Sequence, residues 1–213
     1  MIGGSERVVG PVIAIAVTLT VLIASCGPSP ATPSLGPSPT GSLAPPATAE
    51  GPSPSAAPSG AAVQVDAALL AFVPGAVDGV PLTFDPETSA TIAADPSVAP
   101  DAASLAVALA IVPGTSAADD LAVVSVVRLR DPAKDETWFR DWRDTYDQAA
   151  CGPAGGLVGN AEAEIGGGTV YIGSCAGGVR TYHTRLVAAG IVVSITALGS
   201  RRLGEKVMAG LQR

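Results

Sequence analysis

The stretch Val179–Leu198, VRTYHTRLVAAGIVVSITAL, decides the fold because it predicts a β-hairpin. Both arms, Val179–Val187 and Gly190–Leu198, are rich in β-branched residues, and Ala188-Ala189 provides the turn. This turn makes three apolar pairs on one side: Tyr182 with Ile195, Thr184 with Val193, and Leu186 with Ile191. The other side of the hairpin is more polar and pairs Thr181 with Thr196, His183 with Ser194, and Arg185 with Val192.

Two further strands precede this hairpin. Ala161–Ile165 and Thr169–Cys175 are separated by Gly166-Gly167-Gly168, and Gly177-Gly178 leads into the hairpin. Short connections of this kind join antiparallel neighbours. We therefore expect four consecutive strands to form one antiparallel unit.

The first half of the domain adds further candidate strands. Leu121–Arg130 alternates on one face and predicts a strand, and Val80–Phe84 predicts a brief one. In Leu105–Val112 large residues alternate with alanines, which favours a strand but also allows a helix. If both long segments are strands, they form a hairpin with a long loop that begins at Pro113-Gly114.

The strongest helix is Asp135–Ala150. Its aromatic residues recur at helical spacing and predict a stripe that packs on the core: Trp138, Phe139, Trp142 and Tyr146. Opposite charges four residues apart predict a solvated face: Glu136 with Arg140, Arg140 with Asp144, and Arg143 with Asp147.

Three shorter helices complete the expected elements. Asp66–Val73 ends at Pro74-Gly75, Asp85 caps a helix that runs to Ala94, and Ser200 caps a last helix that runs to Gln212. Together these elements predict an α+β domain with a mostly antiparallel sheet of about four to six strands, covered by helices on one or both faces.

Two of the three cysteines, Cys151 and Cys175, lie in the predicted domain, and the third, Cys26, lies before it. Cys151 ends the aromatic helix and Cys175 ends a strand, so a disulfide between them would pin that helix to the sheet. A zinc site is the weaker interpretation, because no histidine or further cysteine lies at ligand spacing. Cys26 stands apart, at the end of an apolar run.

That apolar run, Val8–Ala24, follows Arg7 and has the length of a signal-peptide core. It ends in Ile23-Ala24-Ser25-Cys26, which resembles the bacterial lipobox. The resemblance implies cleavage before Cys26, a lipid on its sulfur, and a membrane-anchored protein on the extracytoplasmic side. A signal anchor that is not cleaved is the alternative, and it also places the domain outside the cytoplasm.

The chain thus divides into a signal peptide (1–25), a lipidated cysteine with a tether (26–60) and a domain (61–213). The tether consists almost wholly of Pro, Ser, Ala, Thr and Gly, a composition that predicts disorder and leaves sugar attachment open. The net charge of −7 argues against a nucleic-acid partner, because phosphate backbones repel an acidic surface.

Catalytic motifs are absent from the sequence. The single histidine, His183, falls on the polar side of its strand and is expected at the surface. The glycine-rich segments 152–159 and 166–168 lead into strands and lack the lysine of a phosphate-binding loop, and Glu162 and Glu164 are expected to be solvated edge residues. We expect no catalytic residues, metal or cofactor.

One basic spot is a candidate ligand site. Five residues form it: Arg180, His183, Arg185, Arg201 and Arg202. We therefore expect a non-enzymatic module that binds a small ligand, a glycan or an envelope protein. The alternatives are an exported hydrolase that uses His183 and a structural protein of cell-envelope assembly.

The order of elements from Leu105 to Gln212 is similar to that of Mog1/PsbP-like lipoprotein domains. The likeness rests on topology, and it transfers no functional residue to this chain. It implies a meander of strands between helices and a helix at the C-terminal end.

Overall fold

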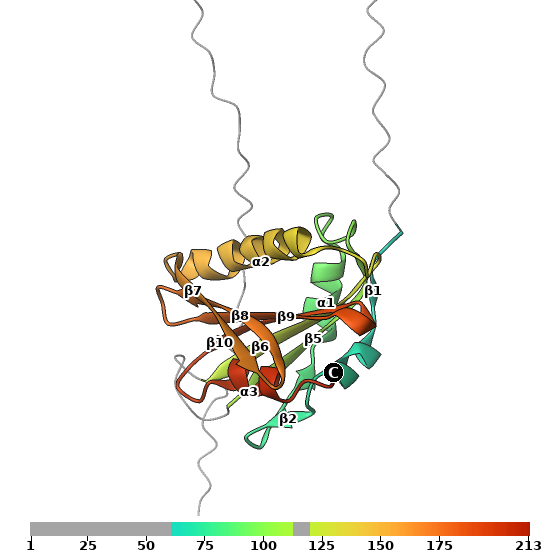
Figure 1. Cartoon of the computed structure of the whole chain (residues 1–213). Helices are drawn as coiled ribbons and strands as arrows, with labels where there is room; N and C mark the ends of the chain where they lie inside the picture. Colours follow the sequence, from blue (N-terminus) through green and yellow to red (C-terminus); the bar gives the residue numbers. More distant parts are fainter. Residues whose placement is uncertain (1–60, 113–119) are drawn as a thin grey trace, which may run out of the picture. The chain divides into compact units, whose positions relative to one another are not determined.

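An eight-stranded sheet forms the centre of the part of the chain that the structure describes (Figure 1). A computed structural model describes residues 61–112 and 120–213, so the predicted signal peptide, Cys26, the tether and the loop at Pro113-Gly114 lie outside the described residues. The strands are β1 (Gln64–Val65), β4 (Thr83–Phe84), β5 (Ala102–Ile111), β6 (Leu121–Leu129), β7 (Leu157–Ile165), β8 (Gly168–Cys175), β9 (Arg180–Leu186) and β10 (Ile191–Leu198).

The strand order is β1-β5-β6-β10-β9-β8-β7, with β4 paired to β5. All of these pairs are antiparallel except β1 with β5, which is parallel. A separate hairpin joins β2 (Ala76–Val77) to β3 (Val80–Pro81). The predicted α+β class with a mostly antiparallel sheet is therefore confirmed. Six of the strands are long, and β1 and β4 add two short edge strands.

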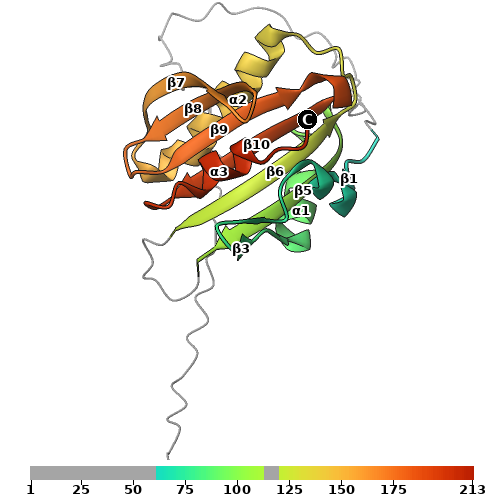
Figure 2. The same cartoon turned by 60° about the horizontal axis from the view of Figure 1, so that its bottom comes forward.

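Helices cover both faces of the sheet. On one face, α1 (Pro86–Ala93) and α2 (Glu136–Cys151) pack with a cluster around Phe139 and Leu105. On the other face, α3 (Leu203–Ala209) and the 3₁₀ helix η1 (Ala67–Phe72) bury the larger cluster. Figure 2 shows α3 lying along β9 and β10, on the face opposite α2. Short 3₁₀ turns follow α2 and β9: η2 (Gly152–Ala154) and η3 (Val187–Ala189).

The predicted register of the hairpin is confirmed pair by pair. Tyr182 faces Ile195 and His183 faces Ser194, with the other four predicted pairs in the same ladder. The connection is the 3₁₀ turn η3 followed by Gly190, whose positive φ of 62° suits glycine. The alternating segment at 105–112 is a strand, β5, which pairs antiparallel with β6.

The last helix differs from the prediction. Helix α3 begins at Leu203 and ends at Ala209, and Ser200 does not cap it. Arg202 occupies the N-cap with a left-handed backbone (φ 56°), and the carboxylate of Asp120 accepts a hydrogen bond from the backbone N–H of Arg201. These local contacts hold residues 199–202 as a turn, so the helix starts later than its apolar pattern indicates.

The bounds of other elements also differ from the predicted ones, by smaller amounts. The expected strand Val80–Phe84 is divided between β3 and β4, and β7 begins four residues before the predicted Ala161, at Leu157. No helix in the described residues is long and apolar enough to cross a membrane.

Candidate functional site

His183 is wholly buried, so the prediction that it lies at the surface is wrong. Its exposed fraction is 0%, because α2 covers the side of the hairpin that the sequence marks as polar. Thr181 and Ser194, from the same polar side, are buried with it. The polar side chains of β9 and β10 therefore face a helix and not solvent.

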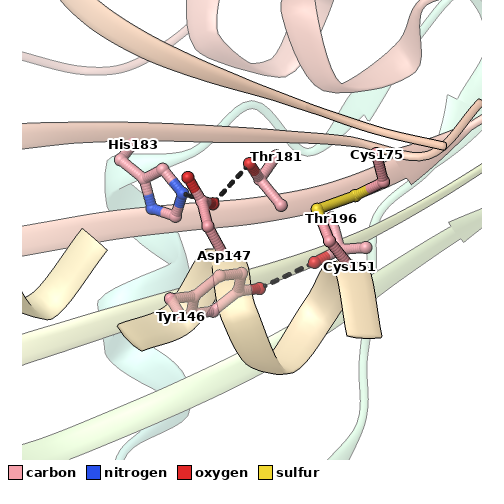
Figure 3. Close-up of a disulfide and its surroundings, with 7 residues drawn as sticks. All are labelled: Tyr146, Asp147, Cys151, Cys175, Thr181, His183 and Thr196. Carbon is pink, nitrogen blue, oxygen red and sulfur yellow. Dashed lines mark hydrogen bonds and ion pairs between the residues drawn. A yellow bond between two sulfur atoms is a disulfide. The ribbon is translucent and has the colours of Figure 1, made fainter. Parts of the chain in front are cut away.

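Hydrogen bonds satisfy both nitrogens of the His183 ring. Nδ1 lies 3.0 Å from Oγ of Ser194 on the neighbouring strand, and Nε2 lies 2.8 Å from Oδ1 of Asp147 on α2. The hydroxyl of Thr181 donates to the same Oδ1 at 2.6 Å, as Figure 3 shows. Asp147 thus bonds α2 to the sheet, and the prediction that it lies on a solvated helix face is wrong.

Tyr146, the neighbour of Asp147 on α2, makes a second polar contact. Its hydroxyl lies 3.0 Å from Oγ1 of Thr196 on β10, and its ring meets the His183 ring edge-on at 5.0 Å (Figure 3). Phe139 lies seven residues before Tyr146 and eight before Asp147, so all three share one helical face. The aromatic stripe and the buried carboxylate form one packing surface.

The disulfide between Cys151 and Cys175 is present, as the sequence predicts. It joins the last residue of α2 to the last residue of β8, one helical turn beyond Asp147. Gly173 on β8 leaves the space that Asp147 occupies, because a Cβ there would lie 2.3 Å from Oγ1 of Thr181 and 2.9 Å from Oδ2 of Asp147. The end of α2 is therefore held both covalently and by close packing.

Electrostatics keep the Asp147 carboxylate ionised. Burial alone would raise its pKa, but the hydrogen bonds from His183 and Thr181 outweigh burial and lower the pKa below the usual value. For Tyr146, burial dominates and raises the pKa, against the hydrogen bond to Thr196. The network therefore combines a charged carboxylate with a neutral phenol.

Ser194, His183 and Asp147 are the residue types of a hydrolase triad, but they are arranged differently. In such triads the serine bonds Nε2 and the aspartate bonds Nδ1, whereas here the two ring nitrogens have the opposite partners. Ser194 is only 1% exposed. A cleft of about 190 Å³ reaches Asp147, but neither Ser194 nor His183 lines it. This network holds α2 to the sheet and offers no nucleophile to a substrate.

A larger pocket lies on the opposite face, where β9 begins and β10 ends. Its volume is about 450 Å³. We call it the arginine pocket, and it is lined by Gly178, Arg180, Tyr182, Ala197, Leu198, Gly199, Ser200 and Arg202. The hairpin register brings its two sides together, because Arg180 pairs with Ala197 across the strands.

Two guanidinium groups and a phenol give the arginine pocket its chemistry. Arg180 lies beside the hydroxyl of Tyr182 and lowers the pKa of that group, although burial has the larger effect and raises it. Arg202 has a side chain that is 60% exposed, and its guanidinium pairs with Glu205 on the next turn. Arg202 is also one of two described non-glycine residues with a positive φ, a backbone strain that is concentrated at functional sites.

The structure brings only two of the five candidate ligand residues together. Arg180 and Arg202 line the arginine pocket, whereas His183 is buried on the far face. Arg185 donates to the backbone carbonyls of Lys134 and Asp135 and lies over the Phe139 ring. Arg201 donates to the backbone carbonyl of Asp78. The single basic spot of the prediction is therefore wrong, since its residues divide between two faces.

Comparison with known proteins finds no relative. No protein-family model, curated protein or solved structure matches the chain. In residues 61–112 and 120–213, no three His, Cys, Asp or Glu side chains gather in a way that could hold a metal ion. The function is therefore inferred from the sequence and the geometry of this chain alone.

Sequence reasoning did not identify Asp147, Tyr182 or Glu205. The eight-residue spacing from Phe139 to Asp147 was the available signal for a buried carboxylate. Tyr182 is predicted on the apolar side of the hairpin, and it packs in the core there, but nothing in the pattern indicates that it also lines a pocket. No sequence pattern singles out Glu205, and only its ion pair with Arg202 in the structure links it to the pocket.

Proposed function

We propose that this protein is a lipid-anchored, extracytoplasmic binding protein that holds a small anionic ligand in the arginine pocket and catalyses no reaction. The observation that carries the proposal is a cavity of about 450 Å³ lined by Arg180, Arg202 and the buried phenol of Tyr182. A volume in this range is typical of small-molecule sites.

The chemistry of the pocket favours an anion. Guanidinium groups are permanently charged forks of N–H donors that match carboxylate and phosphate oxygens. Each hydrogen bond to a charged group contributes about 1.5–3 kcal/mol. The molecule as a whole carries −7, so a local concentration of positive charge is a specific feature and not a reflection of composition.

The anchor rests on the sequence. Ile23-Ala24-Ser25-Cys26 supplies the lipobox, and the following proline-rich segment supplies a spacer between membrane and domain. The disulfide between Cys151 and Cys175 supports this location, because disulfides persist in oxidising compartments outside the cytoplasm. Membrane attachment by acyl chains and ligand capture by the domain are compatible roles.

Binding is tested on the full-length chain, ¹⁵N-labelled and purified in detergent micelles. Titration with inorganic phosphate and with citrate should shift the backbone amide signals of Gly178 and Gly199, which line the pocket. Arg180→Gln and Arg202→Gln should each weaken binding about tenfold or more. Arg128→Gln is the matched control, since Arg128 pairs with Ile191 at the other end of β10. Unchanged binding in both pocket variants would exclude the arginine pocket as the site.

The anchor is tested in the native host. A fatty-acid probe fed to the cells should label the wild-type protein, and Cys26→Ser should abolish the label. Intact mass should show a chain that begins at Cys26 and carries acyl groups. An unlabelled protein that retains residues 1–25 would contradict the lipid anchor and support a signal anchor.

A further inference from the structure

Among the residues that the structure describes, Glu205 is the acidic side chain that pairs with a cationic group of the arginine pocket. Its carboxylate pairs with the Arg202 guanidinium across the first turn of α3. The Glu205 charge also raises the pKa of the Tyr182 hydroxyl. This effect is smaller than that of burial, which raises the pKa, and that of Arg180, which lowers it. Glu205 is therefore close to two groups that line the pocket, although it does not line the pocket itself.

We propose that Glu205 is a specificity-determining residue, which limits the positive charge of the arginine pocket and so reduces the pocket's preference for dianionic over monoanionic ligands. This inference rests on the proposed function, since it concerns the charge of the ligand that the pocket accepts. Arg180 and Arg202 together carry two positive charges, and Glu205 reduces the local sum to one.

The physical argument is the dependence of a Coulomb energy on ligand charge. A negative charge beside the pocket raises the energy of a bound anion in proportion to the anion's own charge. A dianion is therefore penalised twice as strongly, in free energy, as a monoanion of the same shape. Glu205 therefore narrows the affinity advantage that two arginines would give a phosphate monoester over a carboxylate or a phosphodiester.

A positioning role for Glu205 makes the opposite prediction. If the carboxylate served only to hold Arg202 in place, its replacement would weaken every anion alike. Glutamine separates the two roles, because its amide oxygen still accepts a hydrogen bond from the guanidinium while its charge is gone. Glu205→Gln is therefore the informative substitution.

The test uses two probes of similar shape, dimethyl phosphate as the monoanion and methyl phosphate as the dianion, at about pH 8, where a phosphate monoester has lost its second proton. Affinities for the full-length chain in micelles come from the shifts of the Gly178 and Gly199 amides. Glu205→Gln should tighten dimethyl phosphate about fourfold and methyl phosphate about 15-fold, because the free-energy gain doubles with charge. The ratio of the gain in affinity for methyl phosphate to the gain for dimethyl phosphate decides between the two roles of Glu205.

Glu87→Gln is the matched control. Glu87 is an exposed acid in the first turn of α1, so this variant changes net charge equally but lies on the other face of the sheet. It should leave both affinities within about twofold. Unfolding curves for both variants check that the fold is retained, as expected for a partly exposed ion pair.

The outcomes separate the two proposals. Equal gains in affinity for the two esters, no gain, or a loss with Glu205→Gln would overturn the selectivity while leaving the pocket intact, provided that Arg180→Gln still weakens binding. If neither ester shifts the pocket amides in the wild type or in Glu205→Gln, the proposed function itself fails.

Discussion

Nε2 of His183 on β9 and Oδ1 of Asp147 on α2 lie 2.8 Å apart in an interior that solvent barely reaches. The contact joins two residues that are 36 positions apart in the chain. A buried carboxylate is stabilised only if its partners compensate for its lost hydration, so His183 and Thr181 determine whether α2 can pack here. The contact explains why polar residues occupy the centre of this sheet.

Removing Asp147 should therefore destabilise the fold strongly. Asp147→Ala leaves the His183 ring and the Thr181 hydroxyl buried without their acceptor, and we expect a loss of about 3 kcal/mol in the free energy of unfolding. Asp144→Ala, on the exposed side of the same helix, removes only a surface pair with Arg143 and should cost about 0.5 kcal/mol or less. Denaturant unfolding of the full-length chain measures both. Similar losses for the two variants would contradict the anchoring role of Asp147.

The Asp147 contribution should disappear in acid. The folded-state pKa of Asp147 is lowered, so its ionised form adds stability above the usual aspartate pKa of 3.8, and this is lost as pH falls through the lower folded value. The difference in unfolding free energy between the wild type and Asp147→Asn should thus be steady near pH 5 and shrink below about pH 4. A difference that grew on acidification would mean that the pKa is raised.

Much of the fold follows from local patterns. The hairpin of β9 and β10 was predicted in its correct register, because period-two alternation and a short connection leave one register that groups the apolar residues. The aromatic stripe of α2 was likewise predicted to face the core, and Phe139 is buried. The disulfide follows from the positions of Cys151 and Cys175 at the ends of two predicted elements.

The burial of the polar side could not be predicted by the same reasoning. Alternation tells which residues share a face, but it does not tell whether a helix covers that face. His183 is predicted at the surface because it lies on the polar side of its strand, although its partner Asp147 lies on a separate element. The arginine pocket could not be predicted either, because the left-handed backbone at Arg202 leaves no signal in the sequence.

The tyrosines provide a spectroscopic test of burial. The chain has three, and in Tyr146, Tyr171 and Tyr182 alike burial raises the pKa above 10.0. The native protein should show tyrosinate absorbance only above pH 10, whereas the denatured chain should titrate near 10. Because the folded pKa values are raised, stability should fall as pH rises beyond 10. Tyrosinate that formed in native protein near pH 10 would contradict this packing.

The disulfide should contribute about 3 kcal/mol. It closes a loop with a sequence separation of 24, and the chain-entropy model gives a value of this size for such a loop. We expect the double variant Cys151→Ala/Cys175→Ala to unfold at correspondingly lower denaturant. Reduction of the wild type should produce the same shift, which serves as the control, and thiol titration should show two additional free thiols. A shift under reduction without new thiols would point to another cause.

Gly173 should be intolerant of a side chain although it lies in a regular strand. A Cβ at this position would lie 2.3 Å from Oγ1 of Thr181 and 2.9 Å from Oδ2 of Asp147, so Gly173→Ala should displace the carboxylate and cost about 2 kcal/mol. Gly159→Ala on the neighbouring β7 is the matched control, since a Cβ there meets nothing within 4 Å. The two substitutions at the network should also couple: once Asp147 is alanine, Gly173→Ala should cost less, because one of its clashes is gone. Strict additivity in that double-mutant cycle would show that Gly173 does not make room for Asp147.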